Sequence, residues 1–311
     1  MENSNFRKET LDFFLEQAPI MGDIALKYFG NLQPSDVEYK STEQRDPVTI
    51  ADKEISRAIV SKIKERFSDK FLLLTEETVE DFNKNLLEIN KPIIIVDELD
   101  STGNFKGGNP EFSVLFGLAE NNVNRYEMTV GLVYKPVTGE FYFATTDSDA
   151  THQNKEGLQT KLSVSNRHHI ITNASPVNVA INQKRFPERY QDCPTAHFEV
   201  IEAMQEFRNK NRDQVAKNLK LSAGLEIMDV ARGKVDIYLC PNAGNWDYAT
   251  GSLILRQAGG KTYLAKNLEM LINPTEWSLQ LEKPGEYYPI IFTNGSIDQE
   301  FFKYMGEIIK K

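Results

Sequence analysis

Cysteine and histidine are scarce in this chain of 311 residues, which excludes several kinds of site. The two cysteines, Cys193 and Cys240, form no pairing motif, so we expect no disulfide framework and a reducing, cytoplasmic location. The four histidines lie away from the acidic stretches of the sequence: His152, His168, His169 and His197. Because a zinc site requires His or Cys ligands, zinc is not expected.

Long apolar runs are also absent. No stretch approaches the roughly 20 residues of a membrane span, and the N-terminal sequence MENSNFRKETLDFF has neither the basic nor the apolar region of a secretory signal. Basic residues number 36 against 45 acidic ones, which gives a net charge of −9. We therefore expect a cytoplasmic protein that binds no nucleic acid polymer and no membrane, although a metal ion can let an acidic protein bind phosphate.

Helical and strand-like patterns alternate along the first half of the chain. Apolar residues recur at helical spacing over 6–29 and 52–67, and Pro19 and Gly22 are expected to kink or split the first helix. Short strand-like runs follow at 71–74, 92–96, 111–119, 127–136 and 139–146. The last two runs predict a hairpin. The run PIIIV at 92–96 is apolar throughout, which is typical of a strand buried on both faces.

The second half repeats this alternation. Residues 182–194 have the composition of a loop, and 199–219 that of a helix. Further strands are predicted at 235–239, 261–265 and 288–294, and further helices at 248–258 and from 297 onward. We therefore predict an α/β (α+β) protein made of two α/β halves, 1–165 and 166–311.

Acidic residues gather at the ends of four apolar elements: Asp52, the pair Glu76 and Glu77, the pair Asp97 and Asp100, and Asp247. In α/β proteins the loops at strand ends converge on a crevice, where the chemistry is usually found. Taken singly, Asp52 and Asp247 also suit helix caps. Asp97 and Asp100 should repel each other at the end of a buried strand. Divalent cations such as Mg²⁺, which prefer oxygen ligands, would remove this repulsion.

Four motifs in this order resemble those of the inositol monophosphatase family of Mg²⁺-dependent, lithium-sensitive sugar phosphatases. They are DPVTIAD at 46–52, EE at 76–77, DELDSTGNF at 97–105, and WDYATG at 246–251 followed by AGG at 258–260. The resemblance covers most of residues 5–310. It implies a layered α/β/α/β/α sandwich and a homodimer.

The resemblance also implies roles for individual residues. Two or three Mg²⁺ ions would be bound by Glu76, Asp97, the carbonyl of Leu99, Asp100 and Asp247. The attacking water would be oriented by Asp52 and Thr102, with Glu77 as support. The backbone amides of Ser101 and Thr102 would bind the phosphate of a small phosphorylated substrate, a sugar or polyol phosphate. The implied reaction is in-line attack of a metal-activated water on a phosphate monoester.

Three positions depart from the family pattern. Glu98 stands where the family has proline, and we expect it to point to solvent. Ser101 replaces a glycine: it adds strain of roughly 1–2 kcal/mol if φ must be positive, but is a tolerable cap if the backbone starts a helix. Cys240 takes the place of a glutamate that contacts an inositol hydroxyl, so it is the candidate substrate-binding residue, although a small apolar role suits it better. Inositol phosphate is thereby in doubt as the physiological substrate.

Two alternatives remain open. A 3′(2′),5′-bisphosphate nucleotidase would need basic side chains for its second phosphate; Lys40, Lys106 and Arg232 are available, and we expect the last two at the solvated surface. A catalytically weak relative that binds a phosphorylated ligand, or acts as a structural partner, is favoured only by the substitutions at Glu98 and Ser101.

Overall fold

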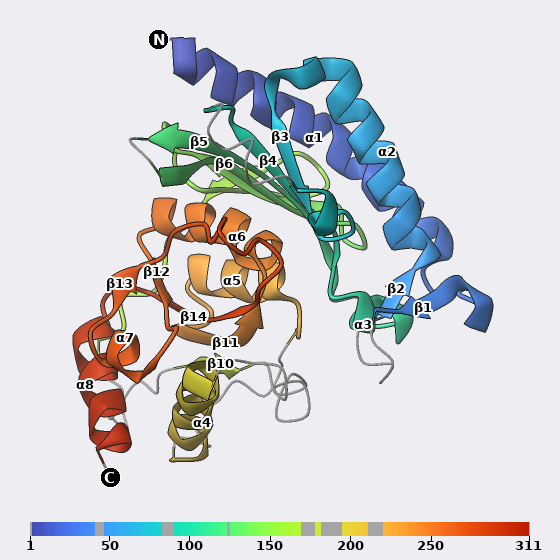
Figure 1. Ribbon diagram of the computed structural model, residues 1–311. Coiled ribbons are helices and arrows are strands. Elements are labelled where there is room, and N and C mark those ends of the chain that lie inside the picture. The colour runs from blue at the N-terminus through green and yellow to red at the C-terminus, as the bar shows by residue number, and fades with distance from the viewer. Residues whose placement is uncertain are drawn as a thin grey trace.

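The computed structural model describes residues 2–40, 47–82, 90–122, 125–168, 178–181, 195–210 and 220–310. The predicted loop at 182–194 and the end of the predicted helix at 211–219 lie outside these residues. Two large sheets form most of the described fold, and helices cover or separate them (Figure 1). Within the described part of the chain, no helix has the length and apolar character to cross a membrane.

The first sheet has seven strands. In spatial order they are β3 (Leu72–Thr75), β4 (Ile93–Asp100), β5 (Ser113–Asn122), β6 (Arg125–Lys135), β7 (Glu140–Thr145), β8 (Thr151–Gln153) and β9 (Gln159–Lys161). β3 is parallel to β4, and the other pairs are antiparallel. The predicted β6–β7 hairpin is confirmed. Every residue of β4 is buried, which confirms its predicted burial on both faces.

Two long helices cover the outer face of this sheet, α1 (Glu2–Tyr28) and α2 (Ile50–Phe67) (Figure 1). Pro19 lies inside α1 without ending it, so of the two predicted effects, a kink or a split, the split does not occur. Tertiary packing explains the difference, because most helix stability in proteins comes from burying an apolar face. Phe14, Ala18 and Met21 are buried around the proline, and Phe14 stacks on Phe116 of β5 at 5.3 Å between ring centroids.

Short elements connect these parts. They are the 3₁₀ turns η1 (Pro34–Asp36), η2 (Ser68–Lys70) and η3 (Val79–Asp81), the paired strands β1 (Val37–Tyr39) and β2 (Pro47–Thr49), and the helix α3 (Thr102–Lys106). β2 leads directly into α2, and α3 directly follows β4. Asp52, which follows β2, and Asp97 and Asp100, which precede α3, therefore lie next to these connections.

The second sheet has five strands. In spatial order they are β10 (Val179–Ile181), β11 (Ile237–Ala243), β14 (Tyr288–Thr293), β12 (Lys261–Leu264) and β13 (Thr275–Glu276). Helices α4 (Thr195–Lys210), α7 (Leu268–Ile272) and α8 (Asp298–Ile309) lie on its outer side (Figure 1). Val200, Met204 and Phe301 belong to the apolar cluster between these helices and the sheet. The predicted strands and helices of this half are confirmed with shifted ends.

Helices α5 (Ala223–Ala231) and α6 (Asn245–Gln257) lie between the two sheets, so the layered α/β/α/β/α sandwich is confirmed (Figure 1). Two glycines let α6 approach the first sheet. A Cβ atom at Gly117 would lie 2.8 Å from Thr250 Oγ1, and one at Gly131 would lie 2.8 Å from the Thr250 carbonyl oxygen. The strands of the first sheet end at residue 161 and those of the second begin at 179; the division of the chain into 1–165 and 166–311 stays a prediction.

Candidate functional site

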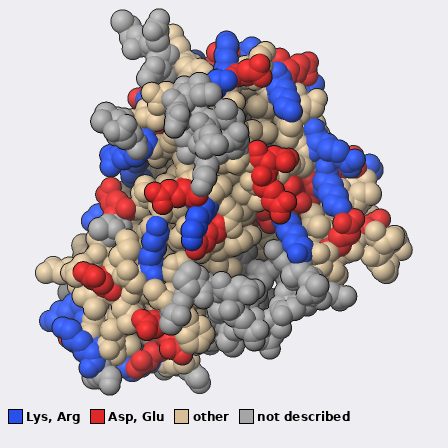
Figure 2. Space-filling model, viewed as in Figure 1, with Lys and Arg blue, Asp and Glu red and all other residues tan. Residues whose placement is uncertain are grey.

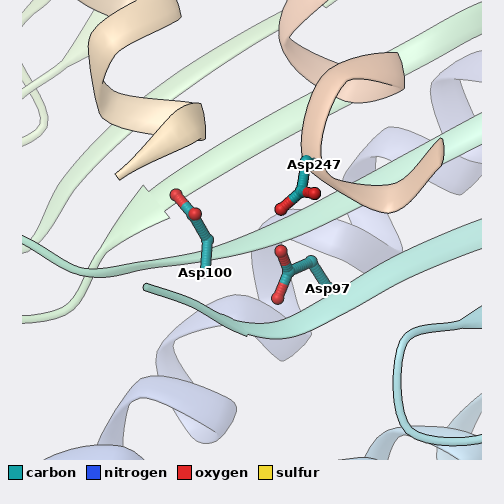
Figure 3. A group of neighbouring side chains, drawn as sticks. All are labelled: Asp97, Asp100 and Asp247. Atoms are coloured by element: carbon teal, nitrogen blue, oxygen red, sulfur yellow. The ribbon is translucent and has the colours of Figure 1, made fainter. Parts of the chain in front are cut away.

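Three buried carboxylates from two distant segments meet between the first sheet and α6. Asp97 and Asp100 come from the end of β4, and Asp247 comes from the first turn of α6. One oxygen from each lies within 4.8 Å of the other two. Asp97 and Asp247 face each other, and Asp100 lies beside them (Figure 3). Burial, and then the nearby charges of Glu76, Asp100 and Asp247, raise the pKa of Asp97 well above its usual value.

A β-bulge brings Asp97 and Asp100 to the same side of the strand. Residues three apart in a regular strand point to opposite faces. Here Asp97 pairs with Leu115 and Asp100 pairs with Ser113, so β4 uses one more residue than β5 over this stretch. The extra residue turns the side chain of Asp100 toward the helices between the sheets. The bulge therefore makes the clustering of both carboxylates possible.

Asp100 is held at the start of α5. Its Oδ2 accepts hydrogen bonds from Ser113 Oγ at 2.9 Å, from Gly224 N at 2.9 Å and from Ser222 Oγ, and its Oδ1 accepts one from Ala223 N at 3.1 Å. Oδ1 accepts a single hydrogen bond, so it has a lone pair available for another partner. These contacts fix the orientation of Asp100 beside the other two acids.

Asp247 serves the helix as well as the cluster. Its Oδ2 accepts a hydrogen bond from the backbone N–H of Gly244 at 2.6 Å, which is the capping role expected of an acid in the first turn. Its side chain is also 4% exposed and belongs to the carboxylate cluster. Asp247 can therefore cap helix α6 and belong to the carboxylate cluster at the same time.

Glu76 and Glu77 follow β3, and both are bound by Lys40. The Lys40 Nζ lies 2.8 Å from an oxygen of each glutamate. Burial raises the pKa of Glu76 to about 8, against the lowering effect of Lys40 and together with the nearby charges of Asp247 and Glu77. Burial acts to lower the pKa of Lys40, but the two glutamates outweigh it and raise that pKa. Lys40, considered above for a second phosphate, is thus engaged by the predicted metal-site acids.

Asp52 and Thr102 lie together at the start of α2 and α3. Thr102 Oγ1 donates to Asp52 Oδ1 at 3.0 Å and lies 3.2 Å from the carbonyl oxygen of Leu99. Asp52 Oδ2 accepts from Thr49 N at 2.8 Å and from the Thr49 hydroxyl, so Asp52 also completes a capping box. Burial raises the pKa of Asp52 to about 6, although the Thr49 hydrogen bonds oppose the shift.

Ser101 adopts a left-handed backbone conformation, with φ 74° and ψ 54°. Of the two conformations considered from the sequence, this is the one that disfavours a side chain. The Ser101 hydroxyl donates to the Leu221 carbonyl oxygen at 3.0 Å, across the gap between α3 and α5. The hydroxyl therefore offsets part of the strain of the backbone.

The expectation that Glu98 points to solvent is wrong. Its side chain is 1% exposed. Because it follows Asp97 in the strand, it points to the opposite face of β4, which α2 covers. Neither carboxylate oxygen is in hydrogen-bond geometry with a described residue. Burial raises the pKa of Glu98 to about 7, and the nearby hydroxyls of Ser56 and Thr75 lower it in part.

The expectation of a solvated Arg232 is also wrong, whereas Lys106 is exposed as predicted. The Arg232 side chain is 20% exposed. Its Nε donates to Asp229 at 2.7 Å and its Nη1 donates to the Tyr142 hydroxyl at 3.0 Å. The Asp229 carboxylate and the Tyr142 hydroxyl therefore hold the guanidinium group of Arg232 at the edge of the core.

Cys240 is not placed where a substrate could reach it. It lies in β11, is 0% exposed, and belongs to the apolar cluster between the two sheets. Its Sγ donates weakly to the Asn242 carbonyl oxygen at 3.8 Å. The suggested contact with substrate is therefore corrected to a packing role, which the small apolar character of cysteine explains.

Several supporting residues were not foreseen from the sequence. Ser113 and Ser222 bind Asp100, and Lys40 binds the glutamate pair. Ser222 alone had a usable signal: it precedes an apolar helical segment, and it caps α5 by accepting a hydrogen bond from Leu225 N at 3.2 Å. Ser113 stands in a continuous apolar strand, where nothing distinguishes a supporting serine from a packed one.

Basic and acidic side chains are mixed on the face of the molecule shown in Figure 2. Among the described residues on that face, no broad field of Lys and Arg is seen, and Asp and Glu side chains group near its middle. This distribution agrees with the net charge of −9 and gives no support for a nucleic-acid surface there.

Comparison with known sequences places these features in a family. The sequence model of the inositol monophosphatase family matches residues 7–280. A Thermotoga maritima protein named fructose-1,6-bisphosphatase/inositol-1-monophosphatase is 26% identical over 304 residues, which cover 97% of this chain and 98% of the relative. A Haemophilus influenzae protein named Nus factor SuhB is 30% identical over 215 residues, which cover 69% of this chain and 70% of the relative.

Solved structures show the same fold. The Thermotoga maritima IMPase superposes with a TM-score of 0.70 at 24% identity, covering 97% of this chain and 98% of that one. A structure described as IMPase/NADP phosphatase complexed with Mg²⁺ and phosphate superposes with a TM-score of 0.69 at 17% identity, covering 95% and 93%. At identities below 25%, the similarity to these solved structures shows that the chain has the same fold.

Proposed function

The chain belongs to the inositol monophosphatase family, and on that premise we propose that it is a Mg²⁺-dependent phosphomonoesterase of a small sugar or polyol phosphate. Membership makes it a phosphoric monoester hydrolase. The cation and the kind of substrate are the proposal. The observation that carries it is the close approach of Asp97, Asp100 and Asp247, three like charges buried together.

The donor atoms of the cluster suit a small, hard divalent cation. All three side chains offer oxygen, which Mg²⁺ prefers, and none offers nitrogen or sulfur. Asp97 Oδ2 is buried and has no hydrogen-bond partner among the described residues. A cation would satisfy that oxygen and remove the repulsion within the cluster. Two or three ions would be held by Asp97, Asp100, Asp247, Glu76 and the Leu99 carbonyl.

The residues around the cluster support a reaction by water attack. When bound, Mg²⁺ polarises the phosphate and lowers the pKa of a water molecule. The single hydroxyl proton of Thr102 lies between two acceptors, Asp52 Oδ1 and the Leu99 carbonyl oxygen. When this proton points to Asp52, the lone pairs of Thr102 Oγ1 are available to accept a hydrogen bond, and then a proton, from the attacking water. Asp52, whose pKa burial raises to about 6, then takes the proton that Thr102 passes on.

Glu77 and Ser101 complete the proposed site. Glu77 lies beside Asp52, where its charge helps to raise the Asp52 pKa. The backbone amides of Ser101 and Thr102, at the turn from β4 into α3, would hold the phosphate during the reaction. Orientation of the phosphate against a fixed water is a large part of catalysis in phosphoryl transfer.

The surroundings of the basic residues favour a monophosphate over a nucleoside bisphosphate. Lys40 is bound by Glu76 and Glu77, and Arg232 is bound by Asp229. Both cations are thus engaged by carboxylates of the protein. The name of the Thermotoga maritima relative, which joins a sugar phosphate and a polyol phosphate, supports the same substrate class.

A catalytically weak relative is the second candidate, and one observation favours it. Ser101 occupies a left-handed conformation at the turn that would bind phosphate, and strain there can misplace the amides by enough to slow the reaction. The Haemophilus influenzae relative carries the name of a Nus factor, which for that protein names a role other than hydrolysis.

Phosphate release distinguishes the candidates. The full chain is incubated with inositol 1-phosphate, fructose 1,6-bisphosphate and adenosine 3′,5′-bisphosphate, with Mg²⁺ or with a chelator. We expect Mg²⁺-dependent turnover of the sugar or polyol phosphate and little of the nucleotide. Preference for the nucleotide would replace our substrate class. Mg²⁺ binding by calorimetry without turnover of any substrate would favour the weak relative.

A further inference from the structure

A short turn before helix α5 is held in a strained conformation. We call residues 220–222 the α5 turn; they lead directly into the helix, and Ser222 is its N-cap. Leu221 has a left-handed backbone, with φ 63°. For a side chain of this size a positive φ is a genuine outlier, and it persists only where the surrounding contacts impose it. Contacts with the rest of the protein therefore hold the α5 turn in place.

Carbonyl groups of the α5 turn contact the segment that follows β4. The Leu221 carbonyl oxygen accepts the hydrogen bond from the Ser101 hydroxyl at 3.0 Å, and the Lys220 carbonyl oxygen accepts one from Asn104 Nδ2 at 2.6 Å. Ser101 is also left-handed, a conformation that a serine does not favour. The bond from its hydroxyl supports that conformation. The backbone of Ser101, whose amide is proposed to bind phosphate, therefore depends on the position of Leu221.

The residues that follow Leu221 position Asp100. Ser222 Oγ and the backbone N–H groups of Ala223 and Gly224 donate to the Asp100 carboxylate. The fit is close, because a Cβ atom at Gly224 would lie only 3.1 Å from Asp100 Oδ2. A displacement of the α5 turn would therefore reach the carboxylate cluster.

Glu226 holds the α5 turn from the helix. Its side chain is 2% exposed, and its Oε1 accepts hydrogen bonds from the backbone N–H groups of Lys220 and, at 3.3 Å, Leu221. Both donors precede the N-cap Ser222, whereas the acid of a capping box binds the N–H of the N-cap itself. A buried carboxylate thus fixes the backbone of the strained turn rather than the end of the helix.

We propose that Glu226 is a positioning residue for the Mg²⁺ and phosphate site. Glu226 fixes Leu221 in its left-handed conformation, and through the α5 turn it fixes Ser101 and Asp100. It is not among the residues proposed to hold the cations or the phosphate. The effect on catalysis rests on the proposed function, whereas the effect on the position of Ser101 and Asp100 is a property of the metal-free protein.

Hydrogen exchange of the full chain in a chelator tests the position of these segments. The Ser101 carbonyl oxygen accepts the backbone N–H groups of Asn104 and Phe105, so peptides covering 99–106 report on this turn. We expect Glu226→Ala to speed exchange about tenfold or more in 99–106 as well as in the α5 turn. Glu226→Gln should change it little, because the amide oxygen still accepts both N–H groups. Unchanged exchange of 99–106 in Glu226→Ala would overturn the proposal.

Asn267→Ala is the matched control for a general loss of stability. The Asn267 side chain caps α7 by accepting a hydrogen bond from Met270 N at 2.8 Å, and α7 lies on the outer side of the second sheet (Figure 1). Its loss should lower the midpoint of chemical denaturation, as the loss of a helix cap does, without changing exchange in 99–106. If circular dichroism shows that Glu226→Ala does not fold, Glu226→Asp replaces it, because its shorter side chain draws the carboxylate away from the turn.

Phosphate release and calorimetric titration with Mg²⁺ test the effect on the site. We expect Glu226→Ala to lower kcat and the affinity for Mg²⁺ about tenfold or more, with a smaller change in KM, because Asp100 and Ser101 are proposed to act on the reacting phosphate. Glu226→Gln should keep most of both, and Asn267→Ala should leave both unchanged. Unchanged kcat and affinity in Glu226→Ala would overturn the proposal.

A double variant tests the route through Leu221. Glycine adopts the left-handed conformation without strain, so Leu221→Gly added to Glu226→Ala should restore part of the lost kcat. No recovery would show that Glu226 does not act through the turn and would refute the assignment. If the unchanged protein neither binds Mg²⁺ nor releases phosphate, the proposed function fails, and the hydrogen-exchange comparison still decides the positioning role of Glu226.

Discussion

Asp97 is the residue on which the metal proposal depends most directly. Asp97→Asn keeps the size of the side chain and removes one charge from the cluster. We expect Mg²⁺-dependent phosphate release to fall to background, because the buried Oδ2 no longer carries charge for a cation. In a chelator the variant should be at least as stable as the unchanged protein, since a like-charge repulsion is lost.

Phosphate release and thermal unfolding measure the two effects. Asp69→Asn, a change of an exposed aspartate, is the control and should alter neither. Retained activity in Asp97→Asn would count heavily against the proposed site. A lower unfolding temperature in chelator would show that Asp97 makes a stabilising contact of its own.

Ser101 gives a second prediction at this scale. Ser101→Gly should keep or raise activity, because glycine adopts the left-handed conformation without the strain of a side chain, roughly 1–2 kcal/mol. The loss of the hydrogen bond to Leu221 opposes this gain by about 1 kcal/mol. Chemical denaturation measures the stability, and phosphate release the activity.

Ser101→Ala is the matched variant. It loses the same hydroxyl but keeps the Cβ atom, so it should be less stable than Ser101→Gly by roughly 1–2 kcal/mol. A large fall in activity in both variants would assign the serine hydroxyl a role of its own. A fall in Ser101→Gly alone would show that the strained turn is required.

At the residue scale, the sequence predicted which acids would gather but not how each side chain is held. Asp97, Asp100 and Asp247 were identified by charge at the ends of apolar elements, and the structure brings them together. Glu98 was mispredicted, although its position allowed a better inference: alternation in a strand buried on both faces sends the neighbour of Asp97 into the opposite layer. Contacts such as Ser113 to Asp100 depend on strand register, which the pattern of residue types does not reveal.

At the scale of elements, α6 connects two regions of the molecule. It carries Asp247 at one end and Arg256 at the other. It packs so closely on β5 and β6 that a Cβ atom at Gly131 would meet the backbone of Thr250, and one at Gly117 would meet the side chains of Met128 and Thr250. A shift of this helix would therefore move a predicted metal ligand.

Gly131→Ala tests this packing. The added Cβ would lie 2.8 Å from the Thr250 carbonyl oxygen, a backbone atom that cannot rotate away. We expect a loss of about 1–3 kcal/mol in the free energy of unfolding, measured by denaturant titration, and a weaker affinity for Mg²⁺, measured by calorimetry. Gly285→Ala, where the nearest atom is at an ordinary 3.6 Å, should change neither. Unchanged stability in Gly131→Ala would show that α6 moves freely on the sheet.

Some helices and strands could be predicted from local sequence patterns, and others could not. The hairpin of β6 and β7 and the buried strand β4 followed from periodicity and composition. The continuous α1 did not, because a proline weakens a helix locally while the sheet beneath stabilises it through packing. The bulge in β4 also has no local signal, since it is defined by pairing with β5.

At the scale of the whole molecule, acids whose pKa values are raised by folding make stability depend on pH. Burial raises the pKa values of Glu76 to about 8, Glu98 and Glu226 to about 7, and Asp52 to about 6. An acid whose pKa is raised by folding contributes stability that is fully present below its unfolded pKa, about 4, and is lost as the pH rises through its folded pKa. The metal-free protein should therefore lose stability across the window from about pH 5 to 8.

Thermal unfolding in a chelator at several pH values measures this loss. We expect the unfolding temperature to fall as the pH rises through the window, and saturating Mg²⁺ to reduce the fall because cations bind the ionised acids. Ca²⁺ provides a comparison with another oxygen-binding ion. An unfolding temperature that stays constant or rises between pH 5 and 8 in chelator would contradict the prediction.

The carboxylate cluster draws on β4 in the first sheet and α6 between the sheets, and this has a consequence for synthesis on the ribosome. The strand with Asp97 and Asp100 emerges long before the segment with Asp247. Until then, the nascent chain exposes an apolar sheet face that α6 later covers, and it lacks one of the three clustered acids. The proposed magnesium site is therefore complete only after the segment with Asp247 has been synthesised.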